Sequence, residues 1–485
     1  MKKQSFGTSD SFLLVIIIAI SLFSRLWNIS HPSVVVFDEV HFGNFSKWYV
    51  LEQFHFDIHP PLGKMIMARI AKAAQYKGDI NSFPALGTPY ALNETSYIPQ
   101  RFTPAIFSSF VSPLLYMSLR LLSVPPYQSF VAALLISLDS SMIVEAKFIL
   151  SDGMLHFFSA LHFFSFCLFQ RYPTGFFAVI SGITLGAATS CKFTALGLVA
   201  VDGIAQLVWI FLERPSFWDI FNRAFLILFP TGLTIFLAWI WHFSSTPYTG
   251  HHSYYIRTQD SHTLIDQSKS NTTYWGNRVM RSPLLIRIIE WNLVMNRINM
   301  RSNIPHPWQS SPQYWPLLLD KYVSFYHGNN DKRIPCFGSP SAYWFSSLGL
   351  FITPIFLVLR LADWRNLLLF FAWSVSYVPF LFVPRTMFHY HYLVPLMFAV
   401  MNLMCLVEKS TIKFLELRGA ITTLIMIIAF LNYVYFFPLI YGRSCPNCYK
   451  TRMWLKRWNE GPPKVYDYFG KDQFNTTEKL ATLFY

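Results

Sequence analysis

A series of about eleven apolar segments constrains the fold of this chain more than any other feature. They cover residues 12–28, 103–122, 126–141, 154–170, 174–190, 193–211, 223–243, 342–360, 366–383, 390–407 and 419–441. A helix needs roughly 20 mostly apolar residues to cross a bilayer. Charged residues make up only 13% of the 485 residues, about half of the usual fraction in soluble proteins. The sequence therefore predicts an all-α polytopic membrane protein, whose short segments leave the span count open by one or two.

The first segment, 12–28, also fits the length of a secretory signal peptide. No small-residue cleavage site follows it in the sequence, and such a site marks a signal peptide that is removed. We therefore expect a retained membrane anchor.

The basic residues of the short connections predict the orientation. They fall on one side of the predicted spans, together with the N-terminus: Lys2, Lys3, Arg171, Arg214, Arg223, Arg360, Arg365, Lys409, Lys413 and Arg418. Short cytoplasmic segments carry an excess of Lys and Arg, so the N-terminus is predicted in the cytoplasm and the C-terminus across the membrane. The same rule explains the formal net charge of +14 better than nucleic-acid binding does, because no basic run tracks a phosphate backbone.

The predicted organisation places the soluble mass on the lumenal side. An N-terminal membrane catalytic core covers 1–243 and includes the lumenal loop 29–102; a second lumenal loop covers 244–341, C-terminal membrane helices cover 342–441, and a lumenal tail covers 442–485. The N-x-S/T sequons agree, since all lie on this side: Asn28, Asn44, Asn93, Asn271 and Asn475. No phosphate-cradling Gly loop is found, which argues against a cytosolic ATP-driven pump.

Cys445 and Cys448 form an isolated CPNC motif in the predicted tail. Such a pair can be redox-active, metal-binding or disulfide-bonded. With no second pair and no His at finger spacing, zinc is disfavoured, and an oxidising lumen favours a structural disulfide.

The adjacent acids Asp38 and Glu39, in FDEVHFG just after the first apolar segment, are the main candidates for chemistry. A carboxylate there can act as a general base on an alcohol, coordinate a cation or pair with an Arg. Neighbouring residues on an extended chain point in opposite directions. One acid can then face the reacting centre while the other anchors the loop, although a solvated acidic pair is the simple alternative.

Further ionisable residues recur at the lumenal ends of the predicted helices. His59 and Lys64 lie in FHFDIHPPLGK, and the others are Arg101, Asp152, Lys192, Arg385, His389 and His391. Each alone is more often structural than catalytic. Ionisable residues at membrane depth are functional candidates, and cations gathered near a carboxylate pair suit a phosphate-linked lipid donor. We expect these residues to bind substrate.

The segments FDEVHFGNF, FHFDIHPPLGKM, YIPQRF, FILSDGM, HPWQSSPQYWPLLL and FHYHYLVPL, in this order, resemble the protein O-mannosyltransferases. This resemblance implies a GT-C type membrane glycosyltransferase of the endoplasmic reticulum. It would move mannose from dolichyl-phosphate mannose to Ser or Thr hydroxyls of secretory proteins, with inversion at the anomeric carbon. Asp38 would be the general base and Glu39 would contact the loop or the acceptor. Arg101 matches the family's Arg, and Lys192 and Arg385 would lie near the donor phosphate.

One departure concerns the MIR β-trefoil module of eukaryotic family members, which we do not find in the loop 244–341. Family members commonly work as dimers of related chains, so a homodimer or heterodimer is expected. No metal cofactor is required by this arrangement, although Mg²⁺ or Mn²⁺ at Asp38 stays open. An inactive family member acting as a partner subunit, and a lipid or solute transporter, are the alternative hypotheses.

Overall fold

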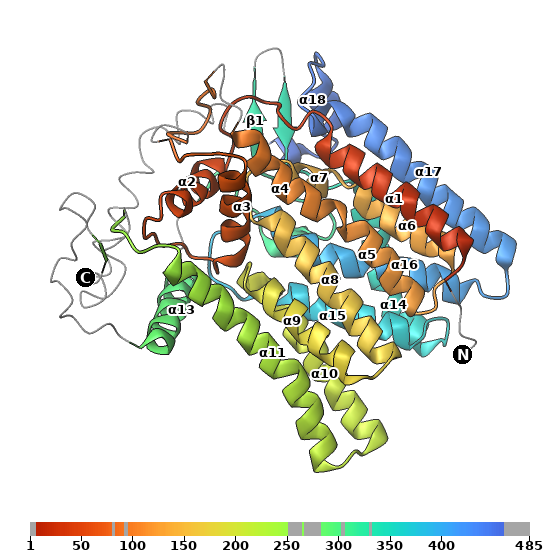
Figure 1. Cartoon of the computed structure of the whole chain (residues 1–485). Coiled ribbons are helices and arrows are strands. Elements are labelled where there is room, and N and C mark those ends of the chain that lie inside the picture. Colours follow the sequence, from red (N-terminus) through yellow and green to blue (C-terminus); the bar gives the residue numbers. More distant parts are fainter. Residues whose placement is uncertain are drawn as a thin grey trace.

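The computed structural model describes residues 6–79, 83–91, 96–250, 264–265, 283–301, 306–328 and 332–459. Long helices run side by side in one bundle, and shorter elements gather at one end of it (Figure 1). We call this the site end of the bundle. The sequons Asn93, Asn271 and Asn475 lie outside the described residues.

The helices of the first part of the chain are α1 (Thr8–Leu26), α2 (Glu39–Val50), α3 (Leu62–Ala73), α4 (Tyr97–Ser109), α5 (Val111–Leu121), α6 (Pro126–Ser137), α7 (Ser140–Ala146), α8 (Asp152–Arg171), α9 (Gly175–Thr189), η1 (Phe193–Ala195), α10 (Leu196–Glu213) and α11 (Phe217–Ser244). Those of the second part are α13 (Leu284–Arg301), η5 (Pro312–Tyr314), α14 (Pro340–Val358), α15 (Trp364–Tyr377), η6 (Val378–Leu381), η7 (His389–Tyr392), α16 (Leu393–Ser410), α17 (Leu415–Ile440), α18 (Cys448–Arg452) and η8 (Lys456–Asn459). Strands β1 (Ser324–His327) and β2 (Arg333–Pro335) form an antiparallel hairpin.

Helices occupy all eleven of the predicted apolar segments. Among the described residues, eight helices are long and apolar enough to cross a membrane, and α6 with α7 forms a further candidate span bent by 56°. Helices α9 and α15 are shorter, at 15 and 14 residues. The prediction of a helical multi-pass membrane protein is confirmed, while the count of eleven spans stays a prediction.

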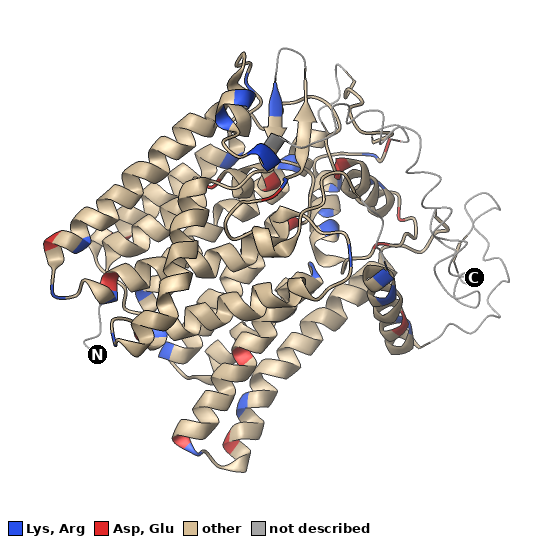
Figure 2. Ribbon diagram, turned by 180° about the vertical axis from the view of Figure 1, so that it is seen from behind, with Lys and Arg blue, Asp and Glu red and all other residues tan. Residues whose placement is uncertain are grey.

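Helix α16 forms the centre of the bundle, because 94% of its apolar stretch is buried. Helices α1, α10 and α11 bury only 22–28% of theirs and turn the remaining apolar surface outward. A helix that is apolar on all sides and only partly buried by protein is what lipid contact requires. Figure 2 agrees, since Lys, Arg, Asp and Glu are sparse along the long helices and gather toward their ends.

Two glycines let α9 pack closely against α11. A Cβ atom on Gly182 would lie 2.3 Å from the carbonyl oxygen of Ile227, and one on Gly186 would lie 2.7 Å from that of Thr231. Small residues at such crossings allow two backbones to approach closely, which is a common way for helices to associate in membranes. This contact holds the α10–α11 pair, the outermost part of the bundle in Figure 1, to the core.

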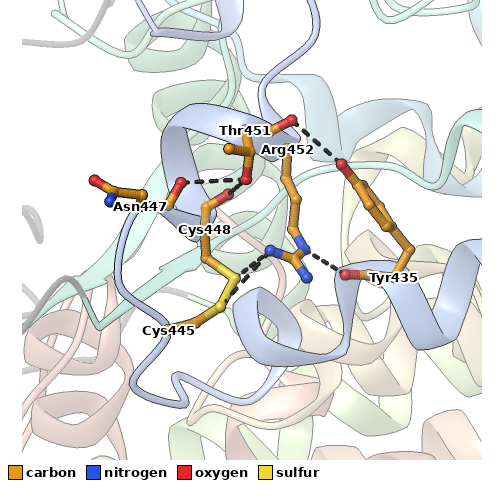
Figure 3. Close-up of a disulfide and its surroundings, with 6 residues drawn as sticks. All are labelled: Tyr435, Cys445, Asn447, Cys448, Thr451 and Arg452. Carbon is orange, nitrogen blue, oxygen red and sulfur yellow. Dashed lines mark hydrogen bonds between the residues drawn. A yellow bond between two sulfur atoms is a disulfide. The ribbon is translucent and has the colours of Figure 1, made fainter.

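The site end also carries the predicted disulfide. Cys445 and Cys448 are joined, and the guanidinium of Arg452 points at both sulfurs while its Nε donates to the carbonyl oxygen of Tyr435 at 2.5 Å (Figure 3). Because Tyr435 belongs to α17, this contact ties the segment after α17 back onto that helix. The structure thus has the disulfide that the CPNC motif favours.

The sequon at Asn44 is engaged in the fold. Its amide nitrogen donates to the carbonyl oxygens of Val40, at 2.5 Å, and Phe83, at 3.0 Å. A glycan on this nitrogen would displace one of these bonds.

Gly182→Ala is expected to destabilise the protein, because the added methyl group overlaps the backbone of α11. Overpacking of this kind costs roughly 1–3 kcal/mol. Gly203→Ala in α10 is the matched control, since nothing lies within 4 Å of its added Cβ. Thermal unfolding of the purified protein in detergent measures both, and equal melting temperatures for the two variants would contradict this account of the α9–α11 contact.

Candidate active site

A fully buried ion pair fixes the loop that follows α1. The guanidinium of Arg101, in α4, donates to both carboxylate oxygens of Glu39, from Nε at 2.7 Å and from Nη2 at 2.8 Å. Neither side chain is exposed to solvent. Glu39 also accepts hydrogen bonds from the backbone N–H groups of Val36, at 3.0 Å, and Ile149, at 3.1 Å. The carboxylate thereby joins its own loop to α4 and to the segment before α8.

Arg101 has no capacity left for a substrate. Its remaining N–H groups donate to backbone carbonyl oxygens of the loop 29–34: Ile29 at 3.4 Å, Pro32 at 2.8 Å and Val34 at 3.0 Å. The five donors of a guanidinium are then all used. Three aromatic rings enclose it, those of Tyr90, Tyr97 and Phe148. The expectation that Arg101 contacts substrate is therefore corrected, because its charge and donors are committed to the loop.

Asp38 is not a member of this buried pair. It precedes the first residue of α2 and is partly exposed. The charges of Lys192, Asp152 and Asp57 all act on its carboxylate, and burial raises its pKa above the ordinary value of 3.8. The structure thus separates the two adjacent acids, with Glu39 inside the protein and Asp38 facing other ionisable groups.

A left-handed residue sets the direction of Asp38. Phe37 has a φ of +40°, a conformation that costs a non-glycine residue roughly 1–2 kcal/mol. Its ring stacks on that of Phe325 at a centroid distance of 4.4 Å and meets the edge of Tyr390 at 6.0 Å. Backbone strain of this kind tends to occur at functional sites, and here the aromatic contacts offset it.

Lys192 and Asp152 form the next buried pair. They come from the starts of η1 and α8, respectively, and are joined by a hydrogen bond of 2.9 Å, with each residue 4% exposed. The Lys192 ammonium also lies 5.6 Å from the centre of the Tyr390 ring. One small region at the site end thus contains Asp38, Asp152, Lys192 and Tyr390. We call this region the reaction chamber.

An apolar groove of about 660 Å³ begins beside the chamber. Its polar lining residues include His59, Lys192, Arg385, His391 and Asn299. The rest is mostly apolar and comes from α10, η6 and their neighbours: Phe193, Leu196, Gly197, Ala200, Val375, Val378, Pro379, Phe380, Val383 and Met387. Since the charges of Lys192 and Arg385 act on both histidines, these polar groups lie together. The groove therefore has a cationic end and a long apolar remainder.

The two cations differ in their surroundings. Lys192 is neutralised in part by Asp152. Arg385 is partly exposed and, within the part of the chain that the structure describes, makes no ion pair; it bonds to the Thr386 carbonyl oxygen and to the Asn299 side chain. Burial beside these cations holds the pKa of His59 well below 6.5, so His59 is neutral near pH 7.

Two candidates from the sequence lie outside the groove. Lys64 forms an ion pair with Asp57 and donates to the His59 carbonyl oxygen at 2.6 Å, so it fastens the loop before α3. His389 packs on the ring of Tyr343, at 4.9 Å, and is 4% exposed. Residues two apart in a 3₁₀-helix point roughly 120° apart, so His391 faces the groove while His389 faces the core. These two expectations of substrate contact are corrected.

Sequence reasoning missed Tyr390 and Asn299. Tyr390 lies between the two histidines of FHYHY, and only the histidines were predicted to bind substrate. Asn299 belongs to a polar stretch of α13 that carries no recognisable motif. Only its hydrogen bond to Arg385, 86 residues away in the chain, reveals it.

Metal ligation was left open by the sequence. Within the described ranges, no group of three or more His, Cys, Asp or Glu side chains is arranged to hold a metal ion. In the chamber, the Asp152 carboxylate is bound to Lys192.

Family models match most of this chain. One described as dolichyl-phosphate-mannose-protein mannosyltransferase matches residues 15–245, and one described as the C-terminal four-helix membrane region of protein O-mannosyltransferase matches residues 284–458. The chain belongs to the protein O-mannosyltransferase family. The resemblance predicted from the sequence motifs is confirmed, and only residues 246–283 separate the two matches.

Curated relatives of this chain agree with its family. The chain is 30% identical over 250 residues to dolichyl-phosphate-mannose–protein mannosyltransferase 1 of Candida albicans, covering 49% of this chain and 28% of that protein. It is 31% identical over 240 residues to mannosyltransferase 1 of Saccharomyces cerevisiae, covering 47% of this chain and 29% of that protein. The matches therefore span less than a third of these relatives' own length.

Solved structures show the same fold. A chain of the S. cerevisiae protein O-mannosyltransferase Pmt1–Pmt2 complex, bound to its sugar donor, matches with a TM-score of 0.85 at 17% identity, covering 96% of this chain and 95% of that one. The archaeal oligosaccharyltransferase AglB of Archaeoglobus fulgidus matches with a TM-score of 0.52 at 13% identity, covering 90% and 56%. The predicted GT-C type fold is confirmed.

Glu39→Gln is expected to destabilise the protein strongly, because Arg101 would keep a buried charge without its partner. Breaking a buried pair on one side costs about 3–5 kcal/mol. Glu52→Gln is the control: Glu52 pairs with Lys72 at 3.1 Å, but both side chains are nearly half exposed, and such pairs contribute about 0–1 kcal/mol. Thermal unfolding in detergent compares them, and an equal loss in both variants would disprove the role of the buried pair.

Proposed function

We propose that this chain transfers mannose from dolichyl-phosphate mannose to Ser or Thr hydroxyls of proteins in the secretory pathway. The observation that carries the proposal is an apolar groove whose polar end holds Lys192 and Arg385, together with the action of the Lys192 charge on the Asp38 carboxylate. A lipid-linked sugar phosphate has the matching order of parts: an apolar tail, an anionic phosphate and a sugar.

The groove suits such a donor. An isoprenoid tail needs an apolar channel, and about 660 Å³ lies within the range of roughly 300–1,000 Å³ common for ligand sites. The phosphate would lie against Lys192 and Arg385, since cationic donors bind phosphate oxygens strongly. His391 and neutral His59 would complete this end of the groove with hydrogen bonds.

The reaction would be a single displacement. The acceptor hydroxyl oxygen attacks C1 of mannose, the bond between C1 and the phosphate oxygen breaks, and dolichyl phosphate leaves with the electron pair. Asp38 takes the hydroxyl proton as general base. Lys192 and Arg385 stabilise the negative charge that develops on the leaving phosphate. Attack from the face opposite the phosphate inverts the anomeric carbon.

The neighbouring residues would support these roles. Asp152 holds the Lys192 ammonium in place through the 2.9 Å hydrogen bond. Glu39 fixes the loop that carries Asp38, and does not itself reach the reacting atoms. Cations can serve the phosphate without a metal ion, although a divalent ion at Asp38 stays a hypothesis that chelation tests.

We further propose the cellular setting that the sequence predicts: the endoplasmic reticulum membrane, with the N-terminus cytoplasmic and the site end lumenal. The family relationship also supports pairing with a second copy or with a related chain. The structural neighbour from S. cerevisiae is itself a complex of two such proteins.

Asp38→Asn is expected to abolish transfer, because the amide cannot accept the hydroxyl proton. General-base catalysis contributes about 10²–10⁴-fold, so kcat should fall by at least about 10²-fold while donor binding persists. The measurement is mannose transfer from dolichyl-phosphate mannose to a Ser/Thr-rich peptide by purified protein, with and without EDTA.

Asp219→Asn is the matched control, since Asp219 is an exposed residue in the first turn of α11. Full activity of Asp38→Asn would refute the general-base role. If the wild type transfers no mannose, alone or mixed with candidate partner chains, the inactive-subunit hypothesis replaces the proposal. Loss of transfer in EDTA that Mg²⁺ or Mn²⁺ restores would add a metal ion to the site.

The pH dependence of mannose transfer should reflect the raised pKa of Asp38. Burial, with the nearby charges of Asp152 and Asp57, raises it above 3.8, while His41 and Lys192 oppose the shift. A general base must be deprotonated, so activity should fall as pH drops through this raised pKa. The measurement is the initial rate of transfer at saturating donor, from neutral pH downward. Donor binding is followed in parallel over the same pH range. An acidic limb at or below 3.8 would contradict the assignment.

A further inference from the structure

Arg385 is held by a neutral side chain. It lies in the connection between η6 and η7, and its Nη1 donates to the Oδ1 atom of Asn299, while its Nε donates to the carbonyl oxygen of Thr386 at 3.3 Å. An amide oxygen orients a guanidinium without cancelling its charge, whereas a carboxylate would neutralise it. The geometry therefore leaves the full positive charge at the cationic end of the groove.

Asn299 is itself fixed from two sides. Its Nδ2 donates to the carbonyl oxygen of Ile58 at 2.8 Å and to that of Met295, one turn earlier in α13, at 3.0 Å. Both N–H groups and the oxygen of the Asn299 amide are therefore hydrogen-bonded. Because Ile58 directly precedes His59, one side chain connects α13, the loop before α3 and the segment that carries Arg385.

Helix α13 offers a firm base for this contact. Its inner face buries Ile288, Trp291 and Met295 in a cluster with Phe54 and Trp239. Figure 1 shows α13 beside the site end of α11, crossing the direction of the long helices. Packing on one face sets the position of the helix, and Asn299 extends from its last turns toward the groove.

The outer face of α13 explains why the helix stays at this level of the bundle. Leu285, Ile289 and Leu293 are 58%, 51% and 59% exposed, at the spacing of one helix face. An amphipathic helix with such a face lies in the interface of a bilayer. Contact of this face with lipid would place the end of the groove that holds Arg385 near the depth of lipid headgroups.

We propose that Asn299 is a positioning residue for donor binding, which holds the Arg385 guanidinium in the orientation that meets the phosphate of the lipid donor. This inference rests on the proposed function. A free Arg side chain loses conformational entropy when it binds a ligand, and fixing it beforehand removes that cost. Asn299 acts only through Arg385 and touches no reacting atom.

The test is a double-mutant cycle on the full chain in nanodiscs, with Asn299→Ala, Arg385→Ala and both together. Asn299→Ala should raise KM for dolichyl-phosphate mannose, and Kd for dolichyl phosphate, on the order of tenfold, as expected for one charge-assisted hydrogen bond. Its kcat at saturating donor should change far less. In the Arg385→Ala background, the same substitution should have no further effect on KM or Kd.

Two more variants keep the test decisive. Asn292→Ala is the control, because Asn292 lies on the same helix, donates to the carbonyl oxygen of Ile288 at 2.8 Å and is not among the residues that line the groove, so donor affinity should be unchanged. Asn299→Asp retains an acceptor for Arg385 but neutralises its charge, and it loses the two N–H donors to Ile58 and Met295, so it should weaken donor binding, with the melting temperature measured alongside to separate this effect from loss of the fold. This variant decides the matter if Asn299→Ala fails to fold.

Unchanged donor affinity in Asn299→Ala would overturn the inference, as would an equal loss with and without Arg385, which indicates a general structural role. Donor affinity in Asn299→Asp equal to that of the wild type would also overturn it. A wild type that neither transfers mannose nor binds dolichyl phosphate instead overturns the proposed function itself, and this inference with it.

Discussion

The buried ion pair between Glu39 and Arg101 is the contact on which the site end of this protein depends. Two charges can be buried this deeply only when their hydrogen-bonding capacity is satisfied. Arg101 meets that condition with the carboxylate and three loop carbonyl oxygens, and Glu39 with two backbone N–H groups besides. The loop after α1 is therefore closed onto α4 and the start of α8. Asp38, the residue just before Glu39, is carried by the same loop.

The same end of the bundle gathers groups from helices that are distant in sequence. Asp38 follows α1, Asp152 begins α8, Lys192 precedes η1 and Arg385 follows η6. Each side chain sits where a helix starts or a connection turns, so the long helices act as the frame and their ends supply the chemistry. The groove between α10, α13 and α15 opens beside this cluster. Its apolar walls and cationic end together fit an amphiphile with an anionic head.

Part of the site could be predicted from the sequence, because that part depends on residues that are close together in the chain. Glu39 is buried and Asp38 is partly exposed, although both lie at the start of a helix and not on an extended chain, and the FHYHY segment brings a histidine to the groove. Which histidine it brings could not be foreseen, because the turn at η7 is a 3₁₀ turn that sends His389 into the core beside Tyr343. The roles of Lys64 and Arg101 were equally hidden. Both are cations at membrane depth, and only their partners reveal that one fastens a loop to Asp57 and the other to Glu39.

The amino-acid sequence by itself determined the helical membrane class, the places of the helices and the family. These follow from apolar length and motif order, both of which act over short stretches of chain. Only the tertiary structure decided which Lys and Arg side chains remain available to bind a phosphate and which are paired within the fold. It also decided that Asn299 holds Arg385. The physical reason is that a charged side chain pairs with whichever group the packing places within hydrogen-bond distance. Those groups belong to residues that are far apart in the chain.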